Sequence, residues 1–473
     1  KDRLIGKIVS CAKEQRSDSA KINLEAYIRQ YFRSVSAEDL LEHPAEQLCT
    51  FAMEHLKTAR KREADEMIIN FVNPSDSDPS WPPDRTILQT VCKDTPFLID
   101  TITMVIQDLN LGVHQTIHPI LRVQRSRHDI LKYILADDET AAKLSVESFA
   151  HFEIDRVGDD KKLKRLKTNL RIALADVRAC TRDWQPMTQK ARDIAAELRA
   201  ERSVVREKDR LEAAELLEWM ADDHFTFLGF REYELNIDDG LPVLTARKRT
   251  GLGILRRTAQ RISRPENPSI QKAILRQAKS RSPLIITKAN SRSTVHRPVR
   301  MDYIGVKRFD EEGRAHIEQR FLGLFTSAAY NRSPRDIPWL RRKVEKVIGS
   351  FKLPAMSHAN KELMHILESF PRDELFQSSI EDLKRIAEGV MGLQERQRVK
   401  VFIRRDPYQR FISSMIYVPK EKYNTIVREK IEAVLLKGFD GETVDSTVLI
   451  SESALARLQC IINILPESSH RSD

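Results

Sequence analysis

A dense group of polar side chains occupies Thr287–Pro298, which reads TKANSRSTVHRP. Two strand-like runs, Leu284–Ile286 and Met301–Phe309, flank this segment. Cationic side chains mixed with neutral hydrogen-bonding groups suit a carboxylate or phosphate ligand, or an acidic protein surface. The segment is therefore a candidate binding or interface loop, whose candidate residues are Lys288, Asn290, Arg292, Thr294, His296 and Arg297.

The same segment has a second interpretation, an intramolecular network that ties a strand-rich domain to its helices. Carboxylates that could accept its hydrogen bonds include Asp302, Asp336 and Glu368. In such a network Arg292 and Arg297 would be partly buried and would make several bonds each. The sequence leaves three alternatives open: an internal network, an interface with another module and a small-ligand site.

His151, Glu153 and Asp155 alternate along a β-prone run and would share one face of a strand. Imidazole and carboxylate groups suit divalent metal ions, so a metal or acid–base site is one interpretation. The other is a solvent-facing or interface strand whose opposite face, Phe152 and Ile154, belongs to the core. We favour the second interpretation.

The glycine pattern Gly251-Leu252-Gly253 suggests a phosphate loop, but Arg256 stands where a dinucleotide fingerprint needs its third glycine. A Walker A motif is also missing from the sequence. We therefore predict no catalytic, cofactor-binding or metal-binding residue in this chain.

The composition indicates a multi-domain globular protein. A chain of 473 residues is too long for one core, and suggests about three to five modules. No apolar run approaches the roughly 18 residues that span a membrane. The five cysteines are scattered and form no C-x-x-C pair, which favours the cytoplasm. The net charge of +10 is small beside 79 basic and 69 acidic residues, so we expect no nucleic-acid partner.

The elements that must position these residues alternate between helical and strand-like stretches. Helical spacing dominates up to the linker Asn73–Asp84, which is rich in Pro, Ser and Asp. A βαββα pattern follows, with strands in 86–91, 113–124 and 149–157, helices in 97–109 and 161–175, and a closing strand within 177–184. The last block, 399–464, shows a β-hairpin, a helix and two strands.

Three motifs carry a family resemblance: HFTFLGFREYEL (His224–Leu235), FLGLFTSAAYNRSPRDIPWLRRKV (Phe321–Val344) and TKANSRSTVHRP. Together they resemble the N-terminal region of the large bacterial NAD-dependent glutamate dehydrogenases, from about Ile87 to Ile464. The resemblance implies an α+β, multi-module chain with ferredoxin-like ACT-type sandwiches, a strand-rich PAS-like domain and helical connectors. The expected modules are an N-terminal helical region (1–83), an ACT-like module (84–186), a helical connector (187–223), the PAS-like domain (224–332), a helical region (333–397) and a second ACT-like module (398–473).

ACT modules often bind amino acids, and the junction Asp94-Thr95-Pro96-Phe97 is similar to the ACT effector loop. These four residues are therefore a candidate effector site. Many amino-acid-binding members have glycine where Phe97 stands, because glycine lets an effector approach the backbone closely. Phe97 thus weighs against effector binding.

The resemblance implies a regulatory and oligomerisation region of an enzyme that oxidatively deaminates L-glutamate to 2-oxoglutarate. The dehydrogenase core of that family lies far downstream, and this chain has no initiator Met, so we expect a non-catalytic fragment. It would hold no cofactor, while the whole enzyme uses NAD. The expected partners are the downstream catalytic region of the same polypeptide, further copies in a homo-oligomer and a candidate amino-acid effector. The alternative is a free-standing amino-acid-sensing ACT protein.

Overall fold

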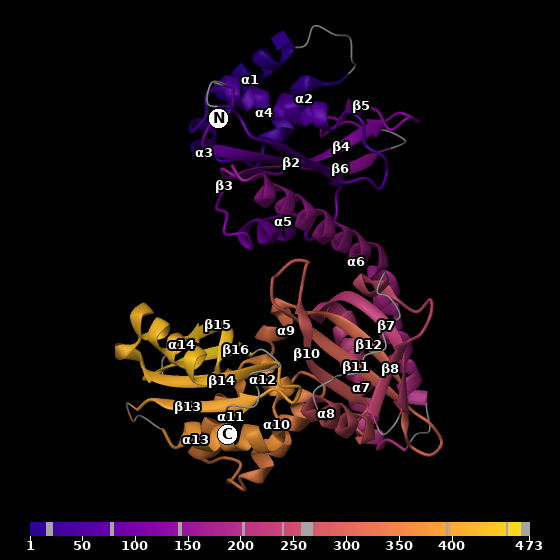
Figure 1. Ribbon diagram of the computed structural model, residues 1–473, viewed down its shortest axis with the longest axis vertical. Helices are drawn as coiled ribbons and strands as arrows, with labels where there is room; N and C mark the ends of the chain where they lie inside the picture. The colour runs from indigo at the N-terminus through magenta and orange to yellow at the C-terminus, as the bar shows by residue number, and fades with distance from the viewer. Residues whose placement is uncertain are drawn as a thin grey trace. The chain divides into compact units, whose positions relative to one another are not determined.

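The computed structural model describes residues 1–15, 22–75, 80–140, 144–200, 204–238, 241–256, 268–393, 396, 398–450 and 453–464. The chain forms two compact units, Lys1–Arg182 with Ser293–Val299, and Asp183–Arg292 with Arg300–Asp473. The described residues form three antiparallel sheets flanked by helices (Figure 1). The expectation of a mixed α and β chain with several sheets is confirmed at this level. None of the described helices is both long and apolar enough to cross a membrane.

The sheet of the first unit has the strand order β1-β2-β6-β4-β5, and β3 also pairs with β6. The strands are β1 (Ile68–Val72), β2 (Arg85–Lys93), β3 (Val113–Ile117), β4 (Ile120–Arg125), β5 (Leu131–Ile134) and β6 (Ser145–Asp155). Every pairing is antiparallel. The central strands β2 and β6 are buried on both faces, so helices must cover the sheet on both sides.

Helices cover both faces of this sheet (Figure 1). On one side lie α1 (Asp2–Gln15), α2 (Leu24–Tyr31), α3 (Ala37–Leu41) and α4 (Ala45–Thr58), and on the other lie α5 (Leu98–Gln107) and the beginning of α6 (Asp160–Ala200). Tyr27, Phe51, Trp81 and Phe149 belong to one hydrophobic core. The N-terminal helices therefore share a core with the sheet. The expectation of helical structure up to the linker Asn73–Asp84 is wrong at Ile68–Val72, which forms β1 and pairs with β2 on the other side of the linker.

Two details of the predicted ACT pattern are wrong. The expected closing strand within 177–184 is part of α6, which continues to Ala200. Val177 and Cys180 are buried and extend the helical spacing of the buried Leu170 and Leu174, so helical periodicity overrides local strand propensity. The expected strand 113–124 is interrupted at Pro119, because proline has no N–H to donate to a ladder.

The second unit begins with the C-terminal part of α6 and α7 (Glu207–Trp219), which is followed by the turn η1 (Met220–His224). Its first sheet has the order β10-β11-β12-β7-β8, and β9 pairs with β7. The strands are β7 (Phe225–Asp238), β8 (Leu241–Ala246), β9 (Leu252–Gly253), β10 (Leu284–Arg292), β11 (Arg300–Phe309) and β12 (Ala315–Phe325), with η2 (Ile254–Arg256) and α8 (Pro268–Lys279) between β9 and β10. The predicted switch to strands after residue 224 is confirmed.

The C-terminal part of this unit places a four-stranded sheet against helices. The helices are α9 (Ser327–Asn331), α10 (Leu340–Ser350), α11 (His358–Ser369), α12 (Arg372–Gln377) and α13 (Ile380–Met391). The sheet has the order β13 (Lys400–Arg405), β14 (Phe411–Pro419), β16 (Leu455–Ile464) and β15 (Gly441–Leu449). After β14 come η3 (Lys420–Lys422) and α14 (Thr425–Phe439), which lies against β15 and β16 (Figure 1). The predicted hairpin, helix and two strands are confirmed.

Candidate functional site

The polar segment predicted as a binding or interface loop begins on β10, where alternate side chains face opposite sides of the sheet. Lys288 faces the helices and is almost fully buried. Its Nζ lies 2.7 Å from Asp302 and 3.0 Å from Asp373. Burial opposes its charge, but the two carboxylates outweigh burial and raise the pKa of Lys288. Lys288 thus joins an internal network with Asp302, one of the carboxylates proposed from the sequence.

Arg292 and Asn290 are less enclosed than Lys288, and each contacts a residue of the C-terminal region. Arg292 pairs with Asp445 at 2.8 Å, and both side chains are about half exposed, at 47% and 56%. An internal network would require Arg292 to be partly buried, and this expectation is wrong for this residue. Asn290 accepts a hydrogen bond from Arg410 at 3.2 Å. Within one segment the structure thus combines a buried ionic contact and a solvent-exposed one.

The tip of the segment, Ser293–Val299, groups with the first unit. Thr294 Oγ1 donates to Asp176 at 2.7 Å. The backbone N–H of His296 donates to Thr101, and its Nδ1 lies 2.7 Å from Asp100. The backbone N–H of Arg297 closes a turn onto Val295. Thr294 and His296 therefore meet polar side chains of α5 and α6.

The His296 ring also lies 5.0 Å from the ring of Phe97, in the candidate effector loop. The structure thus brings together one residue from each of the two sites predicted separately. Phe97 caps the N-terminus of α5 at φ 71°, in the left-handed region. A residue with a Cβ is strained there and glycine is not, which explains physically why glycine suits this position.

The other residues of the effector loop have few polar contacts. The backbone N–H of Asp94 donates to the Val146 carbonyl. Thr95 Oγ1 is buried and has no hydrogen-bond partner among the described residues, while Pro96 is exposed. No ligand contact follows from this geometry, and the effector role of Asp94, Thr95, Pro96 and Phe97 stays a prediction.

The alternating residues His151, Glu153 and Asp155 are split between two environments. His151 and Glu153 are buried beneath α4, where the His151 ring stacks on Phe51. Asp155 is only half buried and accepts a hydrogen bond from the Gly112 N–H. Of the two forms of this expectation, the solvent-facing strand is wrong, because helices cover both faces of the sheet, whereas Phe152 and Ile154 are buried as expected. Within the described ranges no three His, Cys, Asp or Glu residues are grouped to hold a metal ion.

The face of the β10-β11-β12-β7-β8 sheet opposite Lys288 borders a cavity of about 480 Å³. Thr287 and Ala289 reach it from β10, because they alternate with Lys288 along the strand. The remaining walls come from the other strands, from α8 and from the β13–β14 turn, and include Leu235, Leu244, Ile274, Tyr303, Lys307, Glu318, Arg320, Leu322, Tyr408 and Arg410.

The sequence analysis missed this cavity. Its only local signal was the charge alternation Glu318, Arg320 along β12, which indicates one polar face. Sequence could not place Tyr408 and Arg410 there, because they lie about ninety positions further along the chain and reach the cavity through tertiary packing.

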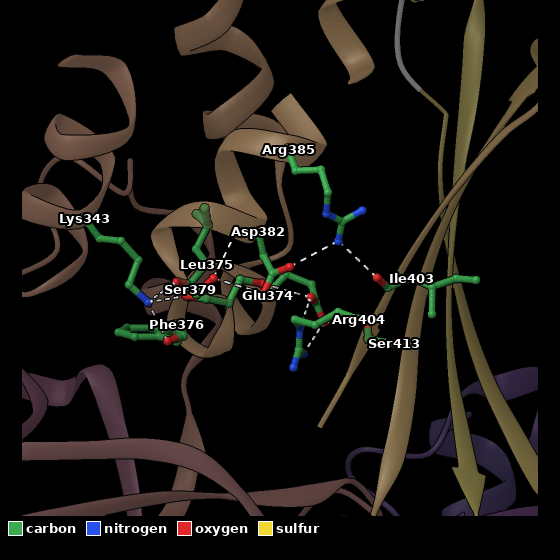
Figure 2. A network of polar contacts seen from close by, with 11 residues as sticks. Lys343, Glu374, Leu375, Phe376, Ser379, Asp382, Arg385, Ile403, Arg404 and Ser413 are labelled. Carbon is green, nitrogen blue, oxygen red and sulfur yellow. Dashed lines mark hydrogen bonds and ion pairs between the residues drawn. The ribbon is translucent and has the colours of Figure 1, made fainter. Parts of the chain in front are cut away.

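A second buried ionic network joins α12 to the C-terminal sheet (Figure 2). Arg404 on β13 donates two hydrogen bonds to Glu374, at 2.8 and 2.9 Å, and Ser413 Oγ donates to the same carboxylate at 2.6 Å. Both charged side chains are at most 5% exposed. Carboxylate and guanidinium are therefore desolvated together, which makes each dependent on the other.

Lys343 lies beside this network and caps the end of α12 (Figure 2). Its Nζ donates to the carbonyls of Leu375, Phe376 and Ser378 at 2.8–3.0 Å. Burial, assisted by the charge of Arg404, lowers the pKa of Lys343 to about 7. A cation at the C-terminal end of a helix satisfies carbonyls that lack helical partners. This arrangement has a structural explanation and requires no ligand.

Comparison with known families matches three parts of the chain. Residues 27–170 match the model of the glutamate dehydrogenase ACT1 domain, residues 337–396 match glutamate dehydrogenase helical motif 1, and residues 400–473 match the glutamate dehydrogenase ACT2 domain. The ACT1 match includes most of α2 and all of α3 and α4, in agreement with the core that these helices share with the sheet.

Curated relatives are similar over almost the whole chain. NAD-specific glutamate dehydrogenases of Halomonas elongata and Pseudomonas aeruginosa are each 32% identical over 95% of this chain. That of Mycobacterium tuberculosis is 27% identical over 87% of it. The chain spans only 28%, 28% and 24% of the length of these three relatives. The solved structure of PelD from Pseudomonas aeruginosa is 11% identical, covers 60% of this chain and 79% of its own, and has a TM-score of 0.15, too low to support a shared fold.

Proposed function

We infer that this chain is the N-terminal regulatory and oligomerisation region of a large NAD-dependent glutamate dehydrogenase. The observation that carries the inference is the pair of ACT-domain matches, at residues 27–170 and 400–473, within one chain that is similar to these enzymes over 95% of its length. The whole enzyme would oxidatively deaminate L-glutamate to 2-oxoglutarate with NAD. Its catalytic region would lie elsewhere on the same polypeptide, in the cytoplasm.

The proposed modules follow the boundaries drawn from the sequence, 1–83, 84–186, 187–223, 224–332, 333–397 and 398–473. For 224–332 we propose a PAS-like domain, supported by its single antiparallel sheet, which packs on α6 and α7 with one face and borders a cavity, walled in part by α8, with the other. This arrangement would let the region bind a small molecule and also connect the two ACT modules.

The first test asks whether the isolated chain has dehydrogenase activity. We expect no glutamate-dependent formation of NADH, because the chain spans only 28% of the first two relatives. The absorbance of NADH, followed with purified chain, glutamate and NAD, measures this directly. Turnover above the background of a heat-treated sample would overturn the proposal. Calorimetry with a panel of amino acids tests the alternative, a free-standing sensor.

We also propose that the C-terminal ACT module mediates self-association with a second copy. Large exposed hydrophobic side chains gather in this module: Val399, Val401, Ile403, Ile426, Val434, Val448, Leu449 and Ile450. Its outer strands, β13 and β15, are sheet edges whose unpaired backbone groups can pair with another strand. A second copy presents the same apolar edge, which makes the surface self-complementary.

Light scattering on matched variants tests this assembly. Val401→Lys on β13 should shift the chain toward the monomer, because a charge then replaces an apolar contact at the edge. Met356→Lys is the control, because Met356 is 84% exposed and lies outside the module. A wild-type chain that stays monomeric at high concentration would contradict the proposal. Equal effects of the two variants would also contradict it.

A further inference from the structure

The cavity beside β12 contains a guanidinium with unused hydrogen-bond donors. Arg320 is held between two tyrosine rings, 3.9 Å from the centroid of Tyr233 and 4.6 Å from that of Tyr303. Its Nε donates to Glu318 at 2.9 Å. Its two terminal nitrogens have no hydrogen-bond partner among the described residues, although the side chain is only 17% exposed. Arg320 is thus fixed in place by two rings and one hydrogen bond, while its two terminal nitrogens can still donate.

Gly305 on β11 helps to fix this arrangement. It pairs with Arg320 across the β11–β12 ladder. A Cβ at this position would lie 3.2 Å from the Tyr303 ring and 3.3 Å from Glu318, closer than ordinary contacts. The absence of a side chain at Gly305 therefore leaves room for the tyrosine and the carboxylate that hold Arg320.

A neutral hydroxyl group complements the guanidinium. The Tyr408 side chain reaches the cavity from the β13–β14 turn. Burial raises the pKa of Tyr408 to about 12, so its hydroxyl keeps its proton near neutral pH. In the described part of the structure this hydroxyl has no hydrogen-bond partner. Gln277 on α8 adds a neutral amide to the same wall.

The charges at the cavity favour one negative charge on a ligand. The cations are Arg320, Arg410 and Lys307, and the carboxylates beside them are Glu318 and Asp406, which holds Arg410 at 2.7 Å. Three cations against two carboxylates leave one positive charge. Burial lowers the pKa of Lys307 to about 8, so its positive charge persists near neutral pH.

Most of the remaining wall is apolar, apart from Thr287 and Asn290. Leu235, Leu244, Ile274 and Leu322 line it, and Ala278 on α8 faces the same space. A cavity of about 480 Å³ is within the size range of small-molecule sites, which combine apolar walls with a few polar groups. A ligand here would place an apolar body against the leucines and one acidic group near Arg320.

We propose that this cavity binds a small monocarboxylate with an apolar or aromatic body, held by the free terminal nitrogens of Arg320 and the hydroxyl of Tyr408. Bidentate pairing of guanidinium and carboxylate supplies orientation as well as affinity. Most of the cavity wall comes from residues 235–322, and Tyr408 and Arg410 reach it from the segment that matches the ACT2 domain. The inference rests on the small-molecule binding proposed above for this sheet, not on the dehydrogenase assignment, and names the ligand class.

Isothermal titration of the chain with phenylacetate tests the proposal, and phenylacetamide serves as the uncharged isostere. We expect saturable binding of phenylacetate, and affinity for the amide lower by about tenfold, because an ionic hydrogen bond is replaced by neutral ones. Arg320→Gln should remove most of this preference, and Tyr408→Phe should weaken phenylacetate by a smaller factor. The control Arg314→Gln alters an exposed arginine on the neighbouring turn and should change nothing.

A cavity-filling variant keeps the test decisive if Arg320→Gln does not fold. Ala278→Phe adds an aromatic ring to the apolar wall without removing a polar group, so it should abolish binding while circular dichroism stays unchanged. The proposal is overturned if the wild-type chain shows no saturable heat with phenylacetate at millimolar concentrations. It is also overturned if the amide binds equally well, or if Ala278→Phe leaves binding intact.

Discussion

One buried carboxylate lies in the first ACT-matching region and another lies where the second ACT-matching region packs on its helices, but the two are neutralised differently. In the first, Glu147 on β6 pairs with two guanidiniums, Arg62 at 2.8 Å and Arg125 at 2.7 Å. In the second, Glu374 has a single guanidinium, Arg404, supported by a serine hydroxyl (Figure 2). The first network can lose one arginine and stay paired, whereas the second cannot. The number of guanidiniums around each carboxylate, and not its burial alone, should decide how much stability a single arginine substitution removes.

The regions also differ in what they connect. Glu147 and its two arginines all lie within residues 27–170, the ACT1 match. Glu374 lies in the helical-motif match, while Arg404 lies in the ACT2 match. The second network therefore joins two segments that separate family models describe. Its loss should loosen the packing of the C-terminal sheet on its helices.

The largest effect is expected for Arg404→Met, which keeps apolar volume and removes the charge. Glu374 would be left buried without a cation, which typically lowers the free energy of unfolding by about 3–5 kcal/mol. Urea unfolding gives the magnitude, and hydrogen exchange in β14 peptides locates it. The double variant Arg404→Met/Glu374→Leu should recover much of the loss, because no lone charge remains. If the double variant is as unstable as the single one, charge burial is not the cause.

The matched substitution in the first region, Arg62→Met, should lower the free energy of unfolding by a smaller amount. Arg125 still donates two hydrogen bonds to Glu147, both at 2.7 Å. We expect the free energy of unfolding to fall by about 1.5–3 kcal/mol, which is the contribution typical of a hydrogen bond to a charged group. The same urea unfolding and hydrogen exchange of β6 peptides measure it. A loss as large as that of Arg404→Met would show that the second arginine gives no protection.

The next largest difference is expected at low pH, which should destabilise the first region more than the second. His55 is buried in the first region, and burial lowers its pKa from 6.5 to about 3. Unfolding lets this histidine bind a proton, so stability is complete above pH 6.5 and declines as the pH falls toward 3. His43, whose pKa is raised despite burial by its contact with Glu153, offsets part of this loss. Between about pH 7 and about pH 5 we expect a net loss of about 1–2 kcal/mol.

Hydrogen exchange at several pH values checks this difference, because residues 400–464 contain no histidine. Peptides of the first sheet should lose protection over that range, and those of β14 and β16 should not. His55→Gln should flatten the pH dependence of the first sheet. An equal pH response in both sheets would argue against His55 as the origin.

The smallest effect is expected for Arg292→Ala. Its ion pair with Asp445 is about half exposed, and such pairs contribute about 0–1 kcal/mol. Thermal melts of wild type and variant measure the change. A large drop in melting temperature would mean that Arg292 acts as an internal tie, in the way that the sequence first suggested. An unchanged melt would contradict the interpretation of Arg292 as an internal tie.

The sequence determined the order and kind of most elements. Periodicity placed the C-terminal hairpin, helix and two strands correctly, because alternation along a strand and spacing along a helix are local properties. The sequence also named Asp302 among the carboxylates that could tie the polar segment internally, and in the structure Lys288 meets Asp302, its neighbour on the paired strand β11. The three resembling motifs were also sufficient to indicate the family.

Tertiary structure decided which polar residues are buried and which share a site. Lys288 and Arg292 look equivalent in the sequence, but β10 directs Lys288 toward Asp302 and Asp373 and leaves Arg292 half exposed. Tyr408 enters a cavity built mainly from strands over seventy positions earlier. Such contacts depend on sheet order and packing between distant segments, and no local pattern of residue types encodes either.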